Sequence, residues 1–255
     1  MTKQSTINFD KNFYNIFHRT TNAQNKIISE HDYTHGPLLA LLRTYLKGRG
    51  LNILDIGCGT GALSIFCASK HHHVTGVDIS DRAIIASQQY AKEVGLEKNT
   101  DFKIGTIDNL TFKKKFNMVC AIEIIEHVSD DDIFLQKLSR ILATNGILIL
   151  TTPSVYAPLY RLGFLTQFDQ RVGHVRRYDM KELLKKIKKS GFTIVKKHET
   201  EGILRNFLYT STLGTKILLR VVNRSRIIQK CVEWIDGKLI AVCGASDYMI
   251  VAKKL

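Results

Sequence analysis

Two glutamates and a histidine stand close together in the stretch "EIIEHV", residues 123–128. Glu123, Glu126 and His127 follow the apolar run "FNMVCAI", so we expect them at the end of a buried strand. Burying a carboxylate costs several kcal/mol unless something pairs with it. Carboxylates and imidazoles also transfer protons in many enzymes, which makes His127 a candidate general base.

Three aspartates come directly after this stretch, and we interpret them as structural. Ser129 is placed to cap a helix, and Asp130, Asp131 and Asp132 would then occupy its first turn. Negative charge is favourable there because the amino end of a helix carries partial positive charge.

A second candidate for proton transfer lies in "GHVRRYDMKEL", residues 173–183. Imidazole groups ordinarily change protonation near neutral pH, so His174 could accept a proton from an attacking hydroxyl or amine. Arg176 or Arg177 could bind a carboxylate or phosphate of a substrate, with Tyr178 beside them. The alternative is an arginine–carboxylate pair, such as one with Asp179, that only holds the structure together.

A glycine-rich loop, "DIGCGTG", covers residues 55–61 and ends an apolar run. Gly57 and its neighbouring glycines permit positive φ and close approach of a ligand to the backbone. Asp78 ends the next apolar run, where a carboxylate can accept hydrogen bonds from both ribose hydroxyls. The loop alone also satisfies the loose dinucleotide-binding pattern, so a nucleoside-containing ligand is indicated without its identity.

The elements that must position these residues alternate between strand and helix. Apolar runs predict strands near 51–57, 73–80, 101–107, 116–122, 147–154, 192–199 and 247–255. Amphipathic segments predict helices between them, including one over 130–146 that ends at Gly146 and one from about Asp179. This alternation predicts an α/β fold with a doubly wound, mostly parallel sheet. The histidines at 71–73 fall in a turn away from the carboxyl edge, so we expect them to be solvated.

Composition bounds the protein class. The chain has 255 residues, of which 44% are hydrophobic and 24% charged, as in an ordinary globular protein. It contains no apolar run long enough for a spanning helix, and its start lacks the features of an export signal. The five cysteines are odd in number and form no C-x-x-C, which predicts reduced thiols and a cytoplasmic protein.

Charge is distributed unevenly along the chain. The formal net charge is +14, and most of it lies after residue 160. Apolar and basic residues interleave over 204–230, a pattern typical of helices at an anionic membrane surface. A helix that caps the domain would give the same pattern, so both interpretations stay open.

The motifs together resemble a known family. "LNILDIGCGTGALS", "VTGVDIS", "CAIEIIEHVSDDDIFLQKLSRILATNGILILTTPS" and "ELLKKIKKSGFTIV" resemble the class I S-adenosylmethionine-dependent methyltransferases, over about residues 50–200. The small-molecule branch, which includes the ubiquinone-biosynthesis O-methyltransferases, is the most similar. The resemblance implies a seven-stranded Rossmann-like sheet with helical N-terminal and C-terminal cap segments. It further implies a lid over 1–45, a cofactor domain over 46–200 with a substrate-cap insertion at 154–178, a helical segment over 201–246 and a final strand over 247–255.

The resemblance also implies which residues contact S-adenosylmethionine. The loop would pack on the methionine part, Asp78 would hold the ribose and residues after the third strand would flank the adenine. The residues carried over are Asp55, Gly57, Cys58, Gly59, Gly61, Asp78, Ile79, Thr106, Ile107 and Ile122. Thr106 departs from the pattern, since many relatives have aspartate there.

In the ubiquinone O-methyltransferases the residues that match Glu123, Glu126 and His127 resemble a divalent-metal site. A metal here could bind a catechol-like acceptor and acidify its hydroxyl. In metal-free relatives the same residues would only order the loop around the cofactor. The N-terminal segment often covers the cofactor in this family, which makes His31 and His35 candidate contacts, His35 on the substrate side.

The expected function is methyl transfer to a hydroxyl or amine of a small-molecule or lipid-linked acceptor. The chain lacks N-P-P-Y and Pro-Cys after the fourth strand, which argues against nucleic-acid bases as acceptors. A basic RNA- or membrane-surface-binding protein that holds the cofactor without turnover is the alternative, and a nicotinamide-dependent enzyme is a more distant one. Peripheral contact with an anionic membrane through residues 204–230 is compatible with either of the first two.

Overall fold

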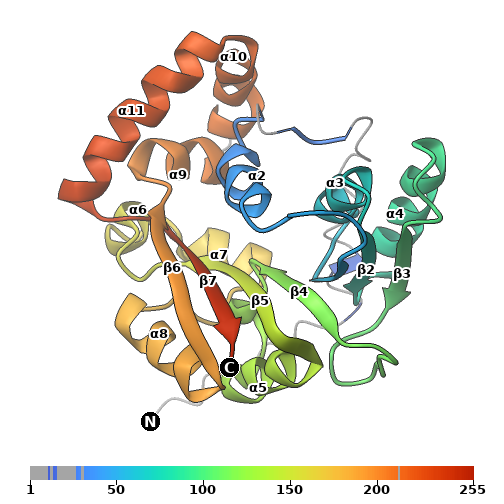
Figure 1. Ribbon diagram of the computed structural model, residues 1–255. Helices are drawn as coiled ribbons and strands as arrows, with labels where there is room; N and C mark the ends of the chain where they lie inside the picture. Colours follow the sequence, from blue (N-terminus) through green and yellow to red (C-terminus); the bar gives the residue numbers. More distant parts are fainter. Residues whose placement is uncertain (1–10, 12–13, 16–26, 30–31, 212) are drawn as a thin grey trace.

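The computed structural model describes residues 11, 14–15, 27–29, 32–211 and 213–255. Its centre is a seven-stranded sheet with the strand order β3-β2-β1-β4-β5-β7-β6 (Figure 1). The strands are β1 Asn52–Ile56, β2 His73–Asp78, β3 Thr100–Ile104, β4 Phe116–Ile122, β5 Leu142–Pro153, β6 Phe192–Thr200 and β7 Asp247–Lys254. Neighbouring strands from β3 to β5 pair in parallel, and β7 runs antiparallel to both β5 and β6. The predicted doubly wound, mostly parallel sheet is confirmed.

Helices cover both faces of the sheet (Figure 1). They are α2 Gly36–Arg43, α3 Ala62–Ser69, α4 Asp81–Glu93, α5 Asp131–Ile141, α6 Pro158–Arg161, α7 Thr166–Val172 and α8 Met180–Lys189. Strand residues alternate between the faces, so that Leu54 packs in a core with α5 and α8 while Ile53 packs in another core with α2 and α3. Most of these strand residues are apolar and nearly inaccessible, which is why the central runs read as continuously hydrophobic.

The segment between β6 and β7 forms a helical cap, residues Ile203–Cys243. It contains α9 Ile203–Thr210, a π-helical turn at Gly214–Leu218, α10 Leu219–Arg224 and α11 Arg226–Cys243. Because β7 is antiparallel, it begins at the edge where the parallel strands end. The cap therefore lies beyond the carboxyl edge of the sheet (Figure 1), where ligands of open α/β sheets bind.

The boundary between α5 and β5 differs from the prediction. The expected helix over 130–146 ends already at Ile141, and Leu142–Gly146 join the strand. Asn145 has φ 62°, and the pairing of β4 with β5 shifts register near this point. A local irregularity thus lets a helix-like sequence continue as strand.

The predicted cap of α5 by Ser129 was wrong. Asp130 is the N-cap, and its side chain accepts a hydrogen bond from the Ile133 amide at 2.8 Å. Asp131 has a second role besides placing negative charge in the first turn of the helix. Its buried carboxylate accepts hydrogen bonds from Tyr178 and Lys186.

One other expectation is corrected. His72 is fully buried rather than solvated, and the Leu51 amide donates to its Nδ1 at 3.3 Å. The basic stretch at 204–230 consists of separate helices, with breaks around Ser211 and Ser225. Most of the predicted lid over 1–45 lies outside the described residues, as does His31, but α2 and Tyr14 lie within them.

Candidate active site

The glycine loop has the conformation that its sequence predicts. Gly57, Gly59 and Gly61 have φ of 72°, 52° and 80°, in the left-handed region that glycine adopts without strain. At Gly57 the close packing matters as well, because a Cβ there would lie 2.3 Å from side-chain atoms of Ile124. The amides of Gly57 and Cys58 both donate to the carbonyl of Val77, which fixes the loop against the end of β2.

Two aspartates frame the loop in different ways. Asp78 accepts hydrogen bonds from the amides of Gly59 and Ser80 at 2.9 and 2.8 Å, which leaves acceptor sites on its carboxylate for a ligand. Asp55 is buried and accepts from the Ser64 hydroxyl at 2.6 Å. Burial raises the pKa of Asp55 to about 6, an effect that this hydrogen bond partly opposes. Asp55 thus ties the loop to α3, and Asp78 is the aspartate that faces the cavity.

A cavity of about 720 Å³ lies at the carboxyl edge of the sheet. It brings together many residues that the sequence predicts for the site: His35, Gly57, Gly59, Asp78, Ile122, Glu123, His127, His174 and Arg177. Its wall continues into the helical cap. One continuous cavity therefore connects the glycine loop with both candidate bases.

Other predicted site residues lie outside the cavity lining. Cys58 and Gly61 support the loop, and Cys58 is buried, which raises the pKa of its thiol. Ile79, Thr106 and Ile107 follow β2 and β3 at the carboxyl edge but do not contribute to the lining. The Thr106 hydroxyl accepts a hydrogen bond from the amide of Asp108 in a local turn.

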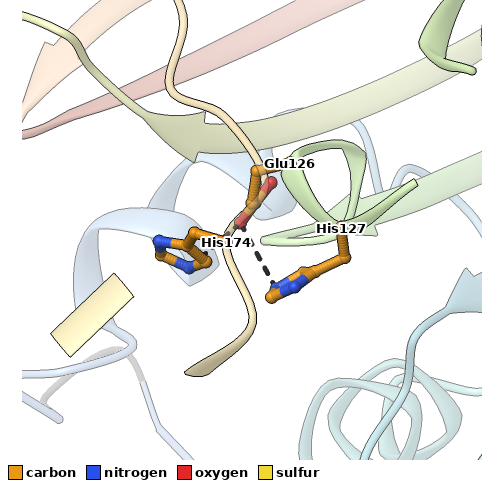
Figure 2. A group of neighbouring side chains, drawn as sticks. All are labelled: Glu126, His127 and His174. Carbon is orange, nitrogen blue, oxygen red and sulfur yellow. Dashed lines mark ion pairs between the residues drawn. The ribbon is translucent and has the colours of Figure 1, made fainter. Parts of the chain in front are cut away.

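Glu126, His127 and His174 form a compact group in which the two histidines line the cavity and Glu126 is buried beside them (Figure 2). The Glu126 Oε1 atom lies 3.9 Å from His127 Nε2 and 3.8 Å from His174 Nε2. Both distances are too long for a direct hydrogen bond. Glu126 is fully buried, and its Oε1 has no hydrogen-bond partner among the described residues, whereas its Oε2 accepts from the Thr152 hydroxyl. A buried, unpartnered carboxylate oxygen facing two imidazole nitrogens is a site for a bound cation or proton.

The other ring nitrogens of the two histidines face oxygen acceptors. His127 Nδ1 lies 2.8 Å from the carbonyl oxygen of Gly173, and His174 Nδ1 lies 3.0 Å from the Asp169 carboxylate. Protons on both Nδ1 atoms satisfy these contacts and leave both Nε2 lone pairs directed at Glu126. The Tyr14 hydroxyl, 3.1 Å from His127 Nδ1, brings the N-terminal segment against the group.

Burial sets the protonation of this group. It raises the pKa of Glu126 to about 8, and hydrogen bonds to the carboxylate oppose the shift. It lowers the pKa of His127 to about 4, an effect that the neighbouring His174 reinforces. At neutral pH without a bound cation, Glu126 is thus mostly protonated and His127 is neutral.

The arginines and tyrosine of the "GHVRRY" stretch are separated by the fold. Arg177 lines the cavity and is held by two hydrogen bonds to Asp169, of 2.6 and 2.9 Å. Arg176 turns away to the carbonyl of Ser129 and the Asp131 carboxylate, and the buried Tyr178 donates to the same carboxylate. The structure thus places Arg176 and Tyr178 in a supporting network rather than in the predicted substrate contacts.

The sequence analysis did not predict the residues at the end of the cavity formed by β6, β7 and the helical cap. Glu201 and Asp247, at the end of β6 and the start of β7, line it together with Arg205 from the cap. Glu123 interacts electrostatically with Glu126 and with these two carboxyls. It is not one of the three residues whose donor atoms lie close enough to share a metal, although the family resemblance suggested it as a ligand. Recognising the last strand as antiparallel would have placed its first residue at the carboxyl edge. Asp169, which holds both His174 and Arg177, has no comparable signal in the sequence.

Three further findings concern related proteins. A family model described as a methyltransferase domain matches residues 47–215. The ubiquinone biosynthesis O-methyltransferase of Azorhizobium caulinodans is 38% identical over 105 residues, 41% of each chain. That of Pelagibacter ubique is 36% identical over 104 residues, 41% of this chain and 42% of the relative. These matches thus span about two fifths of the relatives' length.

Solved structures share the fold at low sequence identity. A magnesium protoporphyrin IX methyltransferase from Synechocystis, with bound S-adenosylhomocysteine, has a TM-score of 0.64 at 17% identity. The match covers 97% of this chain and 96% of that one. A putative sarcosine dimethylglycine methyltransferase from Galdieria sulphuraria has a TM-score of 0.65 at 15% identity, covering 96% of this chain and 97% of that one. The family model matches most of the chain, and these solved structures share the fold of the chain. The chain belongs to the methyltransferase-domain family.

Proposed function

We propose that the protein transfers a methyl group from S-adenosylmethionine to a hydroxyl of a small-molecule or lipid-linked acceptor. One observation carries this proposal: a single cavity connects the left-handed glycine loop and Asp78 with His127 and His174. A binding protein without turnover would need the cofactor end of this cavity but not the buried group of imidazoles and carboxylate. The arrangement therefore favours an enzyme over the RNA- or membrane-binding alternative.

The cofactor would occupy the cavity beside β1 and β2. Gly57 and Gly59 offer backbone that a ligand can approach closely, and Asp78 retains acceptor sites for the ribose hydroxyls. Ile122, at the end of β4, would contact the cofactor from the acceptor side. Ile79, Thr106 and Ile107 stay candidate contacts of the adenine.

His174 is the better candidate for the base. Its Nδ1 proton is donated to Asp169, so the Nε2 lone pair is held ready to take a proton. His127 has a pKa lowered to about 4, which makes it a weak base. The hydroxyl oxygen would attack the methyl carbon in line as the sulfur–carbon bond breaks, and the electron pair would stay on sulfur. Orientation of this kind lowers a barrier by about 7–11 kcal/mol, and removal of the proton adds about 10²–10⁴-fold in rate.

The residues of Figure 2 also fit a divalent metal. The donor atoms of Glu126, His127 and His174 lie within 4.8 Å of one another, and both imidazoles are supported by oxygen acceptors on the far ring nitrogen. Two nitrogens and one oxygen suit Zn²⁺ or Mn²⁺ better than Mg²⁺. When bound, such a metal would acidify an acceptor hydroxyl. The set differs from the one suggested by the resemblance, since His174 replaces Glu123.

Calorimetry tests both parts of the proposal. We expect S-adenosylmethionine to bind the wild-type protein in the presence of EDTA, and Asp78→Asn to weaken that binding about tenfold or more. Zn²⁺ or Mn²⁺ added after removal of EDTA should give a binding signal that Glu126→Gln abolishes. Absence of cofactor binding would refute the methyltransferase proposal, whereas absence of metal binding would leave His174 as the base without a metal.

Peripheral contact with an anionic membrane is proposed for the helical cap. Ile227, Trp234 and Val242 on α11 are 76%, 68% and 84% exposed, and exposed basic residues such as Arg220 and Lys230 lie close to them in sequence. Exposed apolar residues mixed with basic ones are typical of interfacial helices. No helix within the described residues is long and apolar enough to cross a bilayer.

Tryptophan fluorescence tests the membrane contact, because Trp234 is the sole tryptophan of the chain. Vesicles with anionic headgroups should shift its emission to shorter wavelength, and high salt should reverse the shift. Neutral vesicles serve as the control. An unchanged spectrum with both kinds of vesicle would indicate that the exposed face of α11 does not enter a membrane.

A further inference from the structure

Carboxyls are the most numerous ionisable side chains that line the cavity, although the protein as a whole is basic. The chain carries a net charge of +14, yet the described part of the cavity lining has seven carboxyl side chains and two guanidinium groups. The carboxyls belong to Asp78, Glu123, Glu199, Glu201, Glu233, Asp236 and Asp247. A concave site lined by one sign of charge concentrates ligands of the opposite sign. Burial raises the pKa of Glu123, Glu201 and Asp247, so a ligand with positive charge would favour their ionised form. A lining rich in carboxyl groups therefore suits a positively charged ligand.

Two of these carboxyls form a pair at the far end of the cavity. Glu201 and Asp247 both line the cavity there, and burial raises the pKa of each carboxyl, that of Asp247 to about 7. The fold brings them together across 46 positions of sequence, because Thr200 pairs with Asp247 in the β6–β7 ladder and the Ser246 amide donates to the Glu201 carbonyl. Glu201 also has φ 56°, which a non-glycine residue rarely adopts.

The two arginines of the lining donate their hydrogen bonds to other groups. Arg177 is committed to Asp169 through two hydrogen bonds. Arg205 is nearly buried between the rings of Tyr33 and Tyr209 and donates to the Tyr33 carbonyl. Arg205 also forms an ion pair with Glu201 at 3.8 Å, which is beyond hydrogen-bonding distance and leaves the hydrogen-bond acceptor sites of Glu201 to other donors. The pair therefore keeps acceptor capacity for a ligand.

The carboxyl pair lies far from the proposed place of the cofactor. The glycine loop follows β1, and β7 lies three strands further along the sheet. At a spacing of about 4.8 Å between strands, the separation is about 14 Å. The positive sulfonium of a cofactor at the glycine loop thus does not explain the carboxyl pair, which lies on the acceptor side.

A second observation at this end of the cavity also indicates a ligand. Asn206 lines the cavity and is 7% exposed, and its Oδ1 has no hydrogen-bond partner among the described residues. A buried amide oxygen without a partner costs about 1–3 kcal/mol, a cost that a donor on a ligand would remove. Asn206 and the carboxyl pair are all acceptors, so they suit the same donor-rich group.

We infer that the acceptor molecule carries a protonated amine, bound by Glu201 and Asp247 with Asn206 beside them. This inference rests on the proposed function and specifies its substrate class: a hydroxyl compound that also carries an ammonium group. An ammonium has three donors and no acceptor, which matches a wall of oxygen acceptors. A carboxylate or phosphate on the acceptor would be repelled, contrary to what Arg176 and Arg177 suggest in the sequence.

Three probes with the same dihydroxyphenyl ring test the inference. Dopamine carries an ammonium, ethylcatechol no charge and homoprotocatechuate a carboxylate. Calorimetry would use the full chain saturated with S-adenosylhomocysteine, in EDTA, so that metal chelation by the ring does not contribute. We expect dopamine to bind about tenfold more tightly than ethylcatechol, and homoprotocatechuate to bind most weakly.

Two isosteric variants locate the ammonium site. In Glu201→Gln and Asp247→Asn the preference for dopamine over ethylcatechol should fall at least about threefold. Glu97→Gln, on an exposed loop after α4, is the control and should keep the preference. Retained binding of S-adenosylhomocysteine shows that a variant is folded. If one of the two variants does not fold, the other still tests the inference.

The possible outcomes separate this inference from the proposed function. Equal binding of the three probes, no binding of any, or a preference that survives in both folded variants would each overturn the inference while leaving the cofactor assignment intact. Failure of the wild-type protein to bind S-adenosylhomocysteine would overturn the proposed function and this inference together.

Discussion

At the scale of single residues, Gly57 is the position where loop conformation and packing depend on one another. We expect Gly57→Ala to lower the free energy of unfolding and to weaken binding of S-adenosylmethionine, because its Cβ would lie 2.3 Å from Ile124. Gly95→Ala is a matched control, since Gly95 has a similar φ of +69° but a Cβ added there would meet nothing within 4 Å. The Gly57 variant should cost about 1–3 kcal/mol more in denaturant unfolding. Equal costs would mean that only backbone strain matters.

Glu126 gives a pH-dependent prediction. Its pKa rises from an ordinary 4.5 to about 8 on folding, so between these values the folded state binds the extra proton and stability falls as pH increases. His127, with a pKa lowered to about 4, opposes this below pH 6.5. Between pH 6.5 and 8 the Glu126 contribution stands alone within this pair and amounts to about 2 kcal/mol. We expect the loss of stability in that window, measured with EDTA, to be smaller in Glu126→Gln. An identical slope in the variant would contradict the shifted pKa.

The sequence predicted single residues well where one strand carries the chemistry and poorly where distant strands meet. Gly57 and Asp78 each end a strand, so their place at the carboxyl edge follows from the parallel sheet. The partnership of Glu126 with His174 depends on how the segment after β5 folds back, and nothing in the spacing of these residues encodes it. Asp247 depends on the direction of one strand, which apolar patterning does not reveal.

At the scale of elements, α7 supports the candidate base. Asp169 on this short helix holds both His174 and Arg177, so we expect Asp169→Asn to weaken binding of Zn²⁺ or Mn²⁺ about 10–100-fold. Binding of S-adenosylhomocysteine should be unchanged, because Asp169 does not line the cavity. Glu182→Gln, exposed on α8, is the control in calorimetry. A parallel loss of cofactor binding would show instead that the substitution disrupts the domain.

Elements were predicted best where burial is strong. The central strands are almost entirely buried and stood out as apolar runs, whereas the ends of α5 and of the basic cap segment did not. Asn145 in the left-handed region and the helix breaks at Ser211 and Ser225 are local features that hydrophobic periodicity does not register.

At the scale of the whole molecule, the sheet domain and the helical cap differ in how they are held. The 18-residue helix α11 buries one residue among those described, Asp236. Its carboxylate accepts hydrogen bonds from the amides of Gly202 and Leu204, both at 2.8 Å, where the chain leaves β6 for the cap. These two hydrogen bonds therefore help to attach α11 to the rest of the molecule, together with apolar packing of Val232 against Leu208 and its neighbours.

Removal of these two hydrogen bonds should loosen the cap and spare the sheet. We expect Asp236→Ala to speed amide hydrogen exchange over 203–243, consistent with about 1–3 kcal/mol for two amides that lose a buried acceptor. Alanine favours helix more than aspartate does, so intrinsic propensity acts in the opposite direction. Lys238→Ala, exposed on the same helix, should leave exchange unchanged. Faster exchange in β1 and β4 as well would show that cap and sheet unfold as one unit, and access to the cavity could then not be controlled by the cap alone.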